Sequence, residues 1–223
     1  THEVTNQPPP LIDHDVFASD RALAEALVRD GAGWAAAELH ELGRMAGRPE
    51  CQEWGRQANE HPPVLRSHDR YGNRVDLVDY HPAYHQLMSV SVEHGLHAAP
   101  WGDGRPGAHV ARAAKVITWY QVDGGHICPI SMTYSVVPAL RHQPELAGEW
   151  EPRLTSSSYD PSSRPVGEKS GATFGMAMTE KQGGSDVRAN RTTAEPIGDG
   201  EYLLTGHKWF CSAPMSDGFL VLA

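Results

Sequence analysis

Cysteine is scarce in this chain of 223 residues, and the few cysteines are badly placed for a shared site. Cys51, Cys128 and Cys211 lie far apart and form no C-x-x-C pair. This spacing argues against a disulfide framework and against a zinc knuckle, both of which need clustered cysteines. We expect three reduced thiols, mostly buried.

Long apolar runs are lacking as well. No stretch of about 18 uninterrupted apolar residues occurs, and the first ten residues lack the basic and then apolar pattern of a secretory signal. The hydrophobic content of 39% still allows the chain to bury a core. These features favour a soluble, cytoplasmic globular protein without a membrane partner.

Positive charge is in deficit, since 19 Lys and Arg residues stand against 28 Asp and Glu residues, for a formal net charge of −9. Nucleic-acid affinity depends on clustered Lys and Arg side chains. We therefore expect this chain by itself to bind DNA poorly. The sequence also lacks internal repeats and coiled-coil heptads.

Apolar residues at helical spacing fill the first part of the chain, after an extended arm that ends at Pro8-Pro9-Pro10. Asp20 is placed to cap a helix, and Gly47 to stop one. Residues 59–79 are polar and rich in turn formers, which predicts a long loop with a turn at 69–73. Helices are expected after Asp20, over 34–46, from Pro49, from Pro82, over 107–122 and over 129–140.

The periodicity changes after about residue 170. Segments 173–178, 191–197 and 202–210 suit strands, with a hairpin turn at Gly198-Asp199-Gly200. We therefore predict an α-helical domain over 1–170 and the beginning of a β domain over 171–223. The apolar run 219–223 has the composition of a buried strand cut at its end, so we expect the chain to be incomplete.

Two segments of the second part carry the candidate chemistry. Residues 178–186 read M-T-E-K-Q-G-G-S-D, and residues 206–212 read G-H-K-W-F-C-S. Adjacent glycines let a backbone approach a ligand closely, and the hydroxyls and N–H groups can bind a heterocycle or pyrophosphate. On these properties alone, a plain turn is an equally good interpretation.

The two segments together resemble the M-T-E-x-x-x-G-S-D flavin loop and the G-x-K-x-W-I-[ST] strand of the acyl-CoA dehydrogenase family. Within that family, the chain is similar to the AidB-like branch. The similarity lies in K-W-F-x-S and in the segments 6–8, 29–34, 81–85 and 128–133. The resemblance implies FAD as cofactor. Thr179 and the backbone of the preceding strand would bind the isoalloxazine ring, Ser185 the pyrophosphate and Ser212 the region of N5. Phe210 replaces the flavin-stacking Trp of the family. The cofactor-binding residues implied are Met176, Ala177, Met178, Thr179, Gly183, Gly184, Ser185, Phe210, Cys211 and Ser212.

The resemblance also implies an α+β fold, with an N-terminal all-α domain followed by the start of an antiparallel β-barrel. The C-terminal helical domain, which supplies the catalytic base in the family, is not part of the chain, so no catalytic residue is expected here. A homotetramer is implied, with DNA contacts only through that C-terminal domain. The implied role is DNA protection during alkylation stress. The alternatives are a genuine acyl-CoA dehydrogenase, with an acyl-CoA or related substrate, and a non-catalytic interaction subunit.

His81 and His85 have the spacing of metal ligands on a helix. No glutamate follows the first histidine and no third ligand is evident, so a helix cap and a histidine at the edge of the core are the better interpretation. Glu180 and Asp186 are interpreted as loop residues and not as an acid–base pair.

Overall fold

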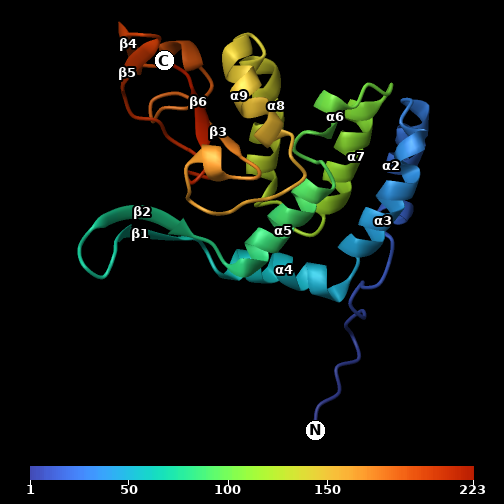
Figure 1. Ribbon diagram of the computed structural model, residues 1–223. Coiled ribbons are helices and arrows are strands. Elements are labelled where there is room, and N and C mark those ends of the chain that lie inside the picture. Colours follow the sequence, from blue (N-terminus) through green and yellow to red (C-terminus); the bar gives the residue numbers. More distant parts are fainter.

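The computed structural model describes residues 1–223, with helices through the first two thirds of the chain and strands near its end (Figure 1). The α-helices are α1 Val16–Ser19, α2 Arg21–Arg29, α3 Ala36–Ala46, α4 Pro49–Glu60, α5 Pro82–Glu93, α6 Ala99–Gly102, α7 Ala108–Tyr120, α8 Ile127–Leu140 and α9 Pro144–Leu154. The strands are β1 Val64–His68, β2 Arg74–Asp79, β3 Phe174–Ala177, β4 Thr193–Gly198, β5 Glu201–Thr205 and β6 Gly218–Val221. Short 3-10 turns occupy Gly33–Ala35, Val166–Glu168 and Val187–Ala189.

Local capping chemistry explains where several helices begin. The Asp20 carboxylate accepts a hydrogen bond of 2.9 Å from the Leu23 N–H and so caps α2. Pro49 and Pro82 stand in the first turns of α4 and α5, where their missing N–H costs nothing. His81 accepts a hydrogen bond from the Ala83 N–H, which confirms its predicted role as a cap. All the predicted helices are present, with small shifts at their ends.

The core of the helical part is built from the apolar faces of these helices. Leu39 and Leu42 of α3 are fully buried. The largest buried cluster includes Leu87, Trp119 and Ile130 from α5, α7 and α8. Each such side chain contributes about 1.5–3 kcal/mol of transfer free energy, so this cluster is the main stabiliser of the helical part.

The expectation that all three thiols are mostly buried is wrong for one residue. Cys51 on α4 is buried, and burial raises the pKa of its thiol to about 11. Cys211 is half-buried, whereas Cys128 is exposed because it lies on the outer side of the first turn of α8.

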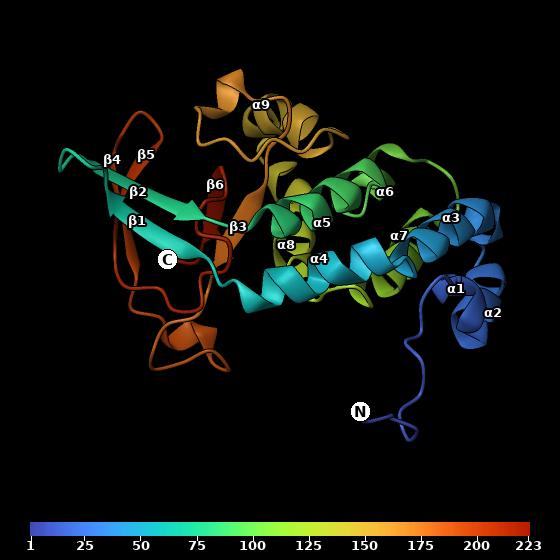
Figure 2. The same ribbon diagram turned by 90° about the horizontal axis from the view of Figure 1, so that it is seen from below.

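The predicted long loop over 59–79 is also wrong, because its central part forms a β-hairpin. β1 and β2 pair antiparallel and project from the helical body (Figures 1 and 2). The predicted turn is present, with the Asp69 carboxylate accepting hydrogen bonds from the N–H groups of Tyr71 and Asn73. All five residues of β1 are exposed, so the strand lacks the alternation of buried and exposed side chains by which strands are recognised.

The second part contains strands where they were expected, but no closed barrel. The strands of the molecule form three two-stranded sheets, and the barrel expectation is therefore not confirmed. β4 and β5 form the predicted hairpin, whereas β3 and β6 pair in parallel and not antiparallel. β5 ends at Thr205, so the strand predicted over 202–210 is wrong beyond that residue.

β3 joins the two parts of the molecule. The Phe174 N–H donates to Thr133 Oγ1 of α8 at 3.0 Å, and the Phe174 ring packs edge-on against Trp150 of α9 at 4.9 Å between centroids. The loops that follow β3 are thereby fixed to the helical body. No helix of the molecule has the length and apolarity needed to cross a membrane.

Candidate cofactor site

The loop after β3 is organised by one buried carboxylate, that of Glu180, which is only 4% exposed. It accepts hydrogen bonds from the Thr192 hydroxyl at 2.6 Å, the Thr192 N–H at 2.9 Å and the Arg191 N–H at 2.8 Å. It also accepts one from Lys208 Nζ at 3.1 Å and another from the Gln182 side chain. Glu180 therefore connects the loop of residues 178–186 to the residues just before β4 and to the segment after β5.

These contacts also set the charge of Glu180. The Thr192 hydroxyl, the Arg191 N–H and the Lys208 ammonium favour the ionised carboxylate and lower its pKa well below the usual range. A carboxylate whose lone pairs are all engaged is a poor proton acceptor. The geometry therefore agrees with the interpretation of Glu180 as a loop residue and not as a base.

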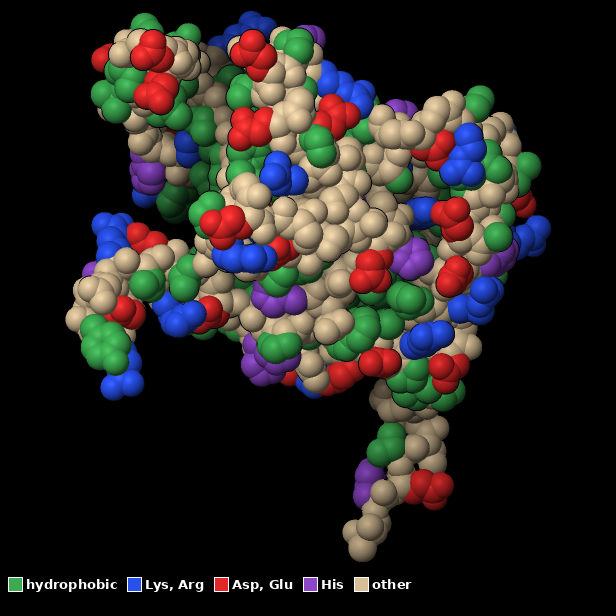
Figure 3. Space-filling model, in the orientation of Figure 1, with side chains coloured by type: hydrophobic (Ala, Val, Ile, Leu, Met, Phe, Trp, Pro, Cys, Tyr) green, Lys and Arg blue, Asp and Glu red, His purple; other side chains and the backbone are tan.

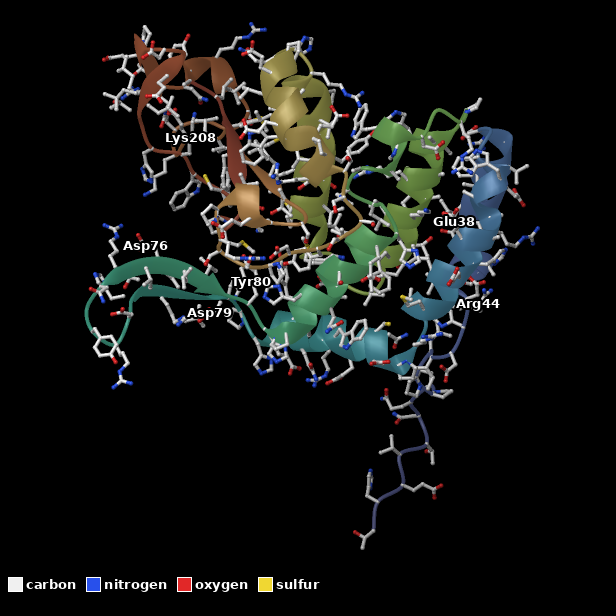
Figure 4. All side chains as sticks on the ribbon, viewed as in Figure 1. Glu38, Arg44, Asp76, Asp79, Tyr80 and Lys208 are labelled. Atoms are coloured by element: carbon white, nitrogen blue, oxygen red, sulfur yellow. The ribbon has the colours of Figure 1, made fainter.

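The two motif segments lie against each other. The Trp209 N–H donates to the carbonyl oxygen of Thr179 at 2.8 Å. The Met178 carbonyl accepts hydrogen bonds from Asn190 Nδ2 at 2.8 Å and from Lys208 Nζ at 3.3 Å. Figure 4 shows Lys208 among the loops beside the strands. Residues 178–180 and 208–209 thus form one unit.

Apolar side chains point outward from this unit. Met178 is 51% exposed, Trp209 42% and Phe210 81%, and the two rings lie 5.8 Å apart in an edge-to-face arrangement. Phe210 has a φ of 60°, in the left-handed region that costs a non-glycine residue about 1–3 kcal/mol. A residue in this conformation does not fit a regular strand, and β5 has already ended at Thr205.

The remaining predicted positions lie on β3 and in the two motif segments. Met176 and Ala177 lie on β3, Gly183 to Ser185 form the tip of the loop, and Cys211 and Ser212 follow Phe210. The hydroxyls of Thr179, Ser185 and Ser212 donate to no other protein group, so they are free to bind a ligand. Ser185 and Ser212 are exposed. Cys211 lies outside any strand, so strand alternation does not determine where its side chain points.

The chemical groups in these two segments are of the kinds that can bind FAD. A Cβ on Gly184 would lie 3.2 Å from Thr179 Cγ2, so the loop backbone passes close to that side chain. Free hydroxyls and loop N–H groups match the acceptors of an isoalloxazine ring and a pyrophosphate. The exposed Phe210 and Trp209 rings offer apolar faces to a planar heterocycle.

A concave region with a volume of about 890 Å³ lies between the β1–β2 hairpin, α5, the segment 159–166 and the residues after Ser212. The space-filling view shows the molecule hollowed beside the hairpin (Figure 3). Tyr80 and Tyr84 stack at 4.1 Å between centroids, and His85 bonds the Tyr159 hydroxyl at 2.9 Å. Burial raises the pKa of the Tyr84 and Tyr159 hydroxyls and lowers that of His85. Sequence reasoning missed this cavity, although the segment H-P-A-Y-H at 81–85 could have indicated it.

The side chains of His81 and His85 have different neighbours. His81 stacks on His61 at 4.5 Å between ring centroids, whereas His85 faces Tyr159. Their spacing therefore reflects a helix cap and a residue at the edge of the core.

Comparison with known proteins identifies the family. The family described as "Adaptive response protein AidB N-terminal domain" matches residues 6–161, and "Acyl-CoA dehydrogenase, middle domain" matches residues 175–223. The chain therefore belongs to the acyl-CoA dehydrogenase family, and within it to the AidB branch.

Among individual relatives, AidB of Escherichia coli (strain K12) is 47% identical over 100% of this chain and 42% of its own length. Acyl-CoA dehydrogenase family member 11 of Caenorhabditis elegans is 32% identical over 92% of this chain and 33% of its own length. The solved structure of Caenorhabditis elegans ACDH-11 in complex with C11-CoA has a TM-score of 0.81 at 30% identity, over 99% of this chain and 38% of that chain. The chain thus spans less than half the length of these relatives.

Proposed function

We propose that this chain is part of an FAD-binding flavoprotein of the acyl-CoA dehydrogenase type. The observation that carries the proposal is the contact between the two motif segments, in which Trp209 bonds Thr179 and Lys208 bonds both Met178 and Glu180. We infer that this contact brings the free hydroxyls, the exposed aromatic rings and the glycine-bearing loop to one surface.

In the proposed site, Thr179 and the backbone of Met176, Ala177 and Met178 hold the edge of the isoalloxazine ring. Gly183, Gly184 and Ser185 bind the pyrophosphate, Phe210 contacts the ring face, and Cys211 and Ser212 lie near its N5 side. FAD supplies two-electron oxidation when bound. The chain's own contribution is to orient the ring and to place the Ser212 hydroxyl as a hydrogen-bond donor.

For the complete protein we propose the role of the AidB branch, namely DNA protection during alkylation stress. The 47% identity to AidB supports this choice. With a net charge of −9, this chain is a poor DNA ligand, so the proposal assigns DNA contacts to other parts of the protein. The catalytic base and a tetrameric assembly are likewise proposed for the complete protein.

A genuine acyl-CoA dehydrogenase is the second candidate. The structural neighbour in complex with C11-CoA favours it, together with the cavity of about 890 Å³ beside the proposed site. The two candidates differ in turnover. Brisk oxidation of ordinary acyl-CoA substrates by the full-length protein would support the dehydrogenase, and bound FAD with little turnover would support the AidB role.

The cofactor proposal is tested by replacing two of the free hydroxyls, Thr179→Val and Ser212→Ala, in the full-length protein. We expect less FAD to be retained through purification, with an unchanged circular dichroism spectrum, because neither hydroxyl has a partner within the protein. The matched control is Thr205→Val with Ser67→Ala, which removes two exposed hydroxyls on β5 and β1. FAD occupancy equal to wild type in the test variant would contradict the assignment.

A further inference from the structure

A small cavity of about 120 Å³ lies beside α3, α6 and α7, away from the proposed cofactor site. Three cationic side chains line it, Arg105, Arg112 and Lys115, together with two carboxylates, Glu38 and Asp103. The lining therefore carries more positive than negative charge.

Two of the three cations already have a counterion. Arg105 pairs with Asp103 at 2.7 Å. Lys115 pairs with Glu38 at 2.6 Å and also donates to the His94 carbonyl. Glu38 lies between α3 and α7 in Figure 4. Arg112 forms no ion pair with any carboxylate of the chain, so the unbalanced charge of the cavity is its guanidinium.

The Arg112 guanidinium is held in place. Its Nε donates to the Leu96 carbonyl at 2.7 Å, and its central carbon lies 3.7 Å from the centroid of the Tyr134 ring. The stacked ring stabilises the face of the cation, but the N–H bonds lie in the guanidinium plane and still need acceptors. Nη2 is buried and has none.

This arrangement is unfavourable without a further acceptor. A buried donor left unpaired costs about 1–3 kcal/mol, and more when it carries charge. Burial accordingly lowers the pKa of Arg112 from its ordinary value. Lys115 follows Arg112 by three residues on α7, so both cations lie on one face of the helix.

We propose that this cavity binds a small tetrahedral oxyanion of the phosphate or sulfate type, with Arg112 as its main ligand and Lys115 and Arg105 as supporting charges. The volume suits an ion of this size and is below the roughly 300–1,000 Å³ of sites that enclose drug-sized molecules. The planar N–H groups of a guanidinium match two oxygens of such an ion. The site is independent of the proposed flavin function.

The test is calorimetric titration of inorganic phosphate into the full-length protein, at constant ionic strength maintained with chloride. We expect saturable binding at one site per chain, and at least tenfold weaker binding by Arg112→Gln. The matched control is Arg44→Gln, which removes a cation 61% exposed on α3. We expect it to bind as wild type does.

Three results would overturn the proposal. The first is no saturable phosphate binding by the wild-type protein, which would mean that Arg112 serves only to stack on Tyr134 or finds its acceptor in the rest of the protein. The second is equal binding by wild type and Arg112→Gln. The third is equal loss of binding in Arg44→Gln, which would indicate nonspecific charge attraction. Thermal melts of all three proteins identify a variant that has not folded. If Arg112→Gln does not fold, Arg112→Lys replaces it. We again expect weaker phosphate binding, because an ammonium group cannot form the planar pair of hydrogen bonds.

Discussion

Glu180 is the most highly connected polar side chain of the candidate site, and its contacts explain why the two motif segments lie together. Its partners come from three separate stretches of chain, the loop itself, the start of β4 and Lys208. A neutral amide in its place keeps the size of the side chain but loses the charge and turns one acceptor into a donor. The ionised carboxylate is therefore what aligns the segments.

Glu180→Gln is expected to lower both thermal stability and FAD retention. The pKa of Glu180 is lowered in the folded protein from an ordinary value of 4.5, so its contribution to stability is fully present above that pH and is lost as pH falls below it. The melting temperature of wild type should then decrease more steeply between about pH 5 and pH 3 than that of Glu180→Gln. Parallel pH profiles of the two proteins would argue against this role.

Gly184 supports a separate prediction at the tip of the loop. Gly184→Val places a branched side chain where the backbone lies close to Thr179 and where the pyrophosphate is proposed to bind. We expect strongly reduced FAD content with little change in the melting temperature of the apoprotein, because the loop is exposed. Gly148→Val, at a helix position with no neighbouring atoms within 4 Å, is the control for adding an isopropyl group. Wild-type flavin content in Gly184→Val would refute the loop assignment.

The path of the chain after β5 is determined by close packing and not by a local sequence pattern. A Cβ on Gly206 would lie 2.3 Å from Thr192 Oγ1, the same hydroxyl that bonds Glu180. Gly206 therefore lets the chain leave the β4–β5 hairpin and approach the buried carboxylate.

Gly206→Ala should accordingly destabilise the protein by about 1–3 kcal/mol, the usual cost of overpacking. Gly148→Ala, in the exposed part of α9, should be neutral or slightly stabilising because alanine is the better helix former. Chemical denaturation of both variants measures the difference. Equal stability of the two would show that the contact between Gly206 and Thr192 is unimportant.

The helices could be predicted from the sequence because each has local signals, such as Asp20 as a cap, Pro49 and Pro82 in first turns, and Leu39 and Leu42 on one buried face. The β1–β2 hairpin could not, since all residues of β1 are exposed and show no burial pattern. α9 was missed because Pro152 lies inside it and its composition is polar. Pairing between β3 and β6 depends on contacts distant in sequence, which no local pattern specifies.

The candidate site was partly predictable for the same reason. Its two segments could be recognised from their residues, but the buried network of Glu180, Thr192 and Lys208 that joins them could not. The large aromatic cavity beside α5 also depends on Tyr159, which lies 74 residues after His85 in sequence.

The chain exposes the apolar side chains of Phe210 and Met178. Apolar side chains so exposed next to free hydroxyls are typical of a binding region and not of a finished exterior. Since the chain spans 42% of AidB, we infer that the remainder of the protein and the cofactor together cover this region.

The most direct measurement is the visible absorption spectrum of the full-length protein purified without added flavin, combined with quantification of the released cofactor. We predict a flavin spectrum and close to stoichiometric FAD per chain. A protein that folds but shows no flavin absorption, and that acquires none after incubation with excess FAD, would contradict the proposed function and would favour a non-catalytic scaffold.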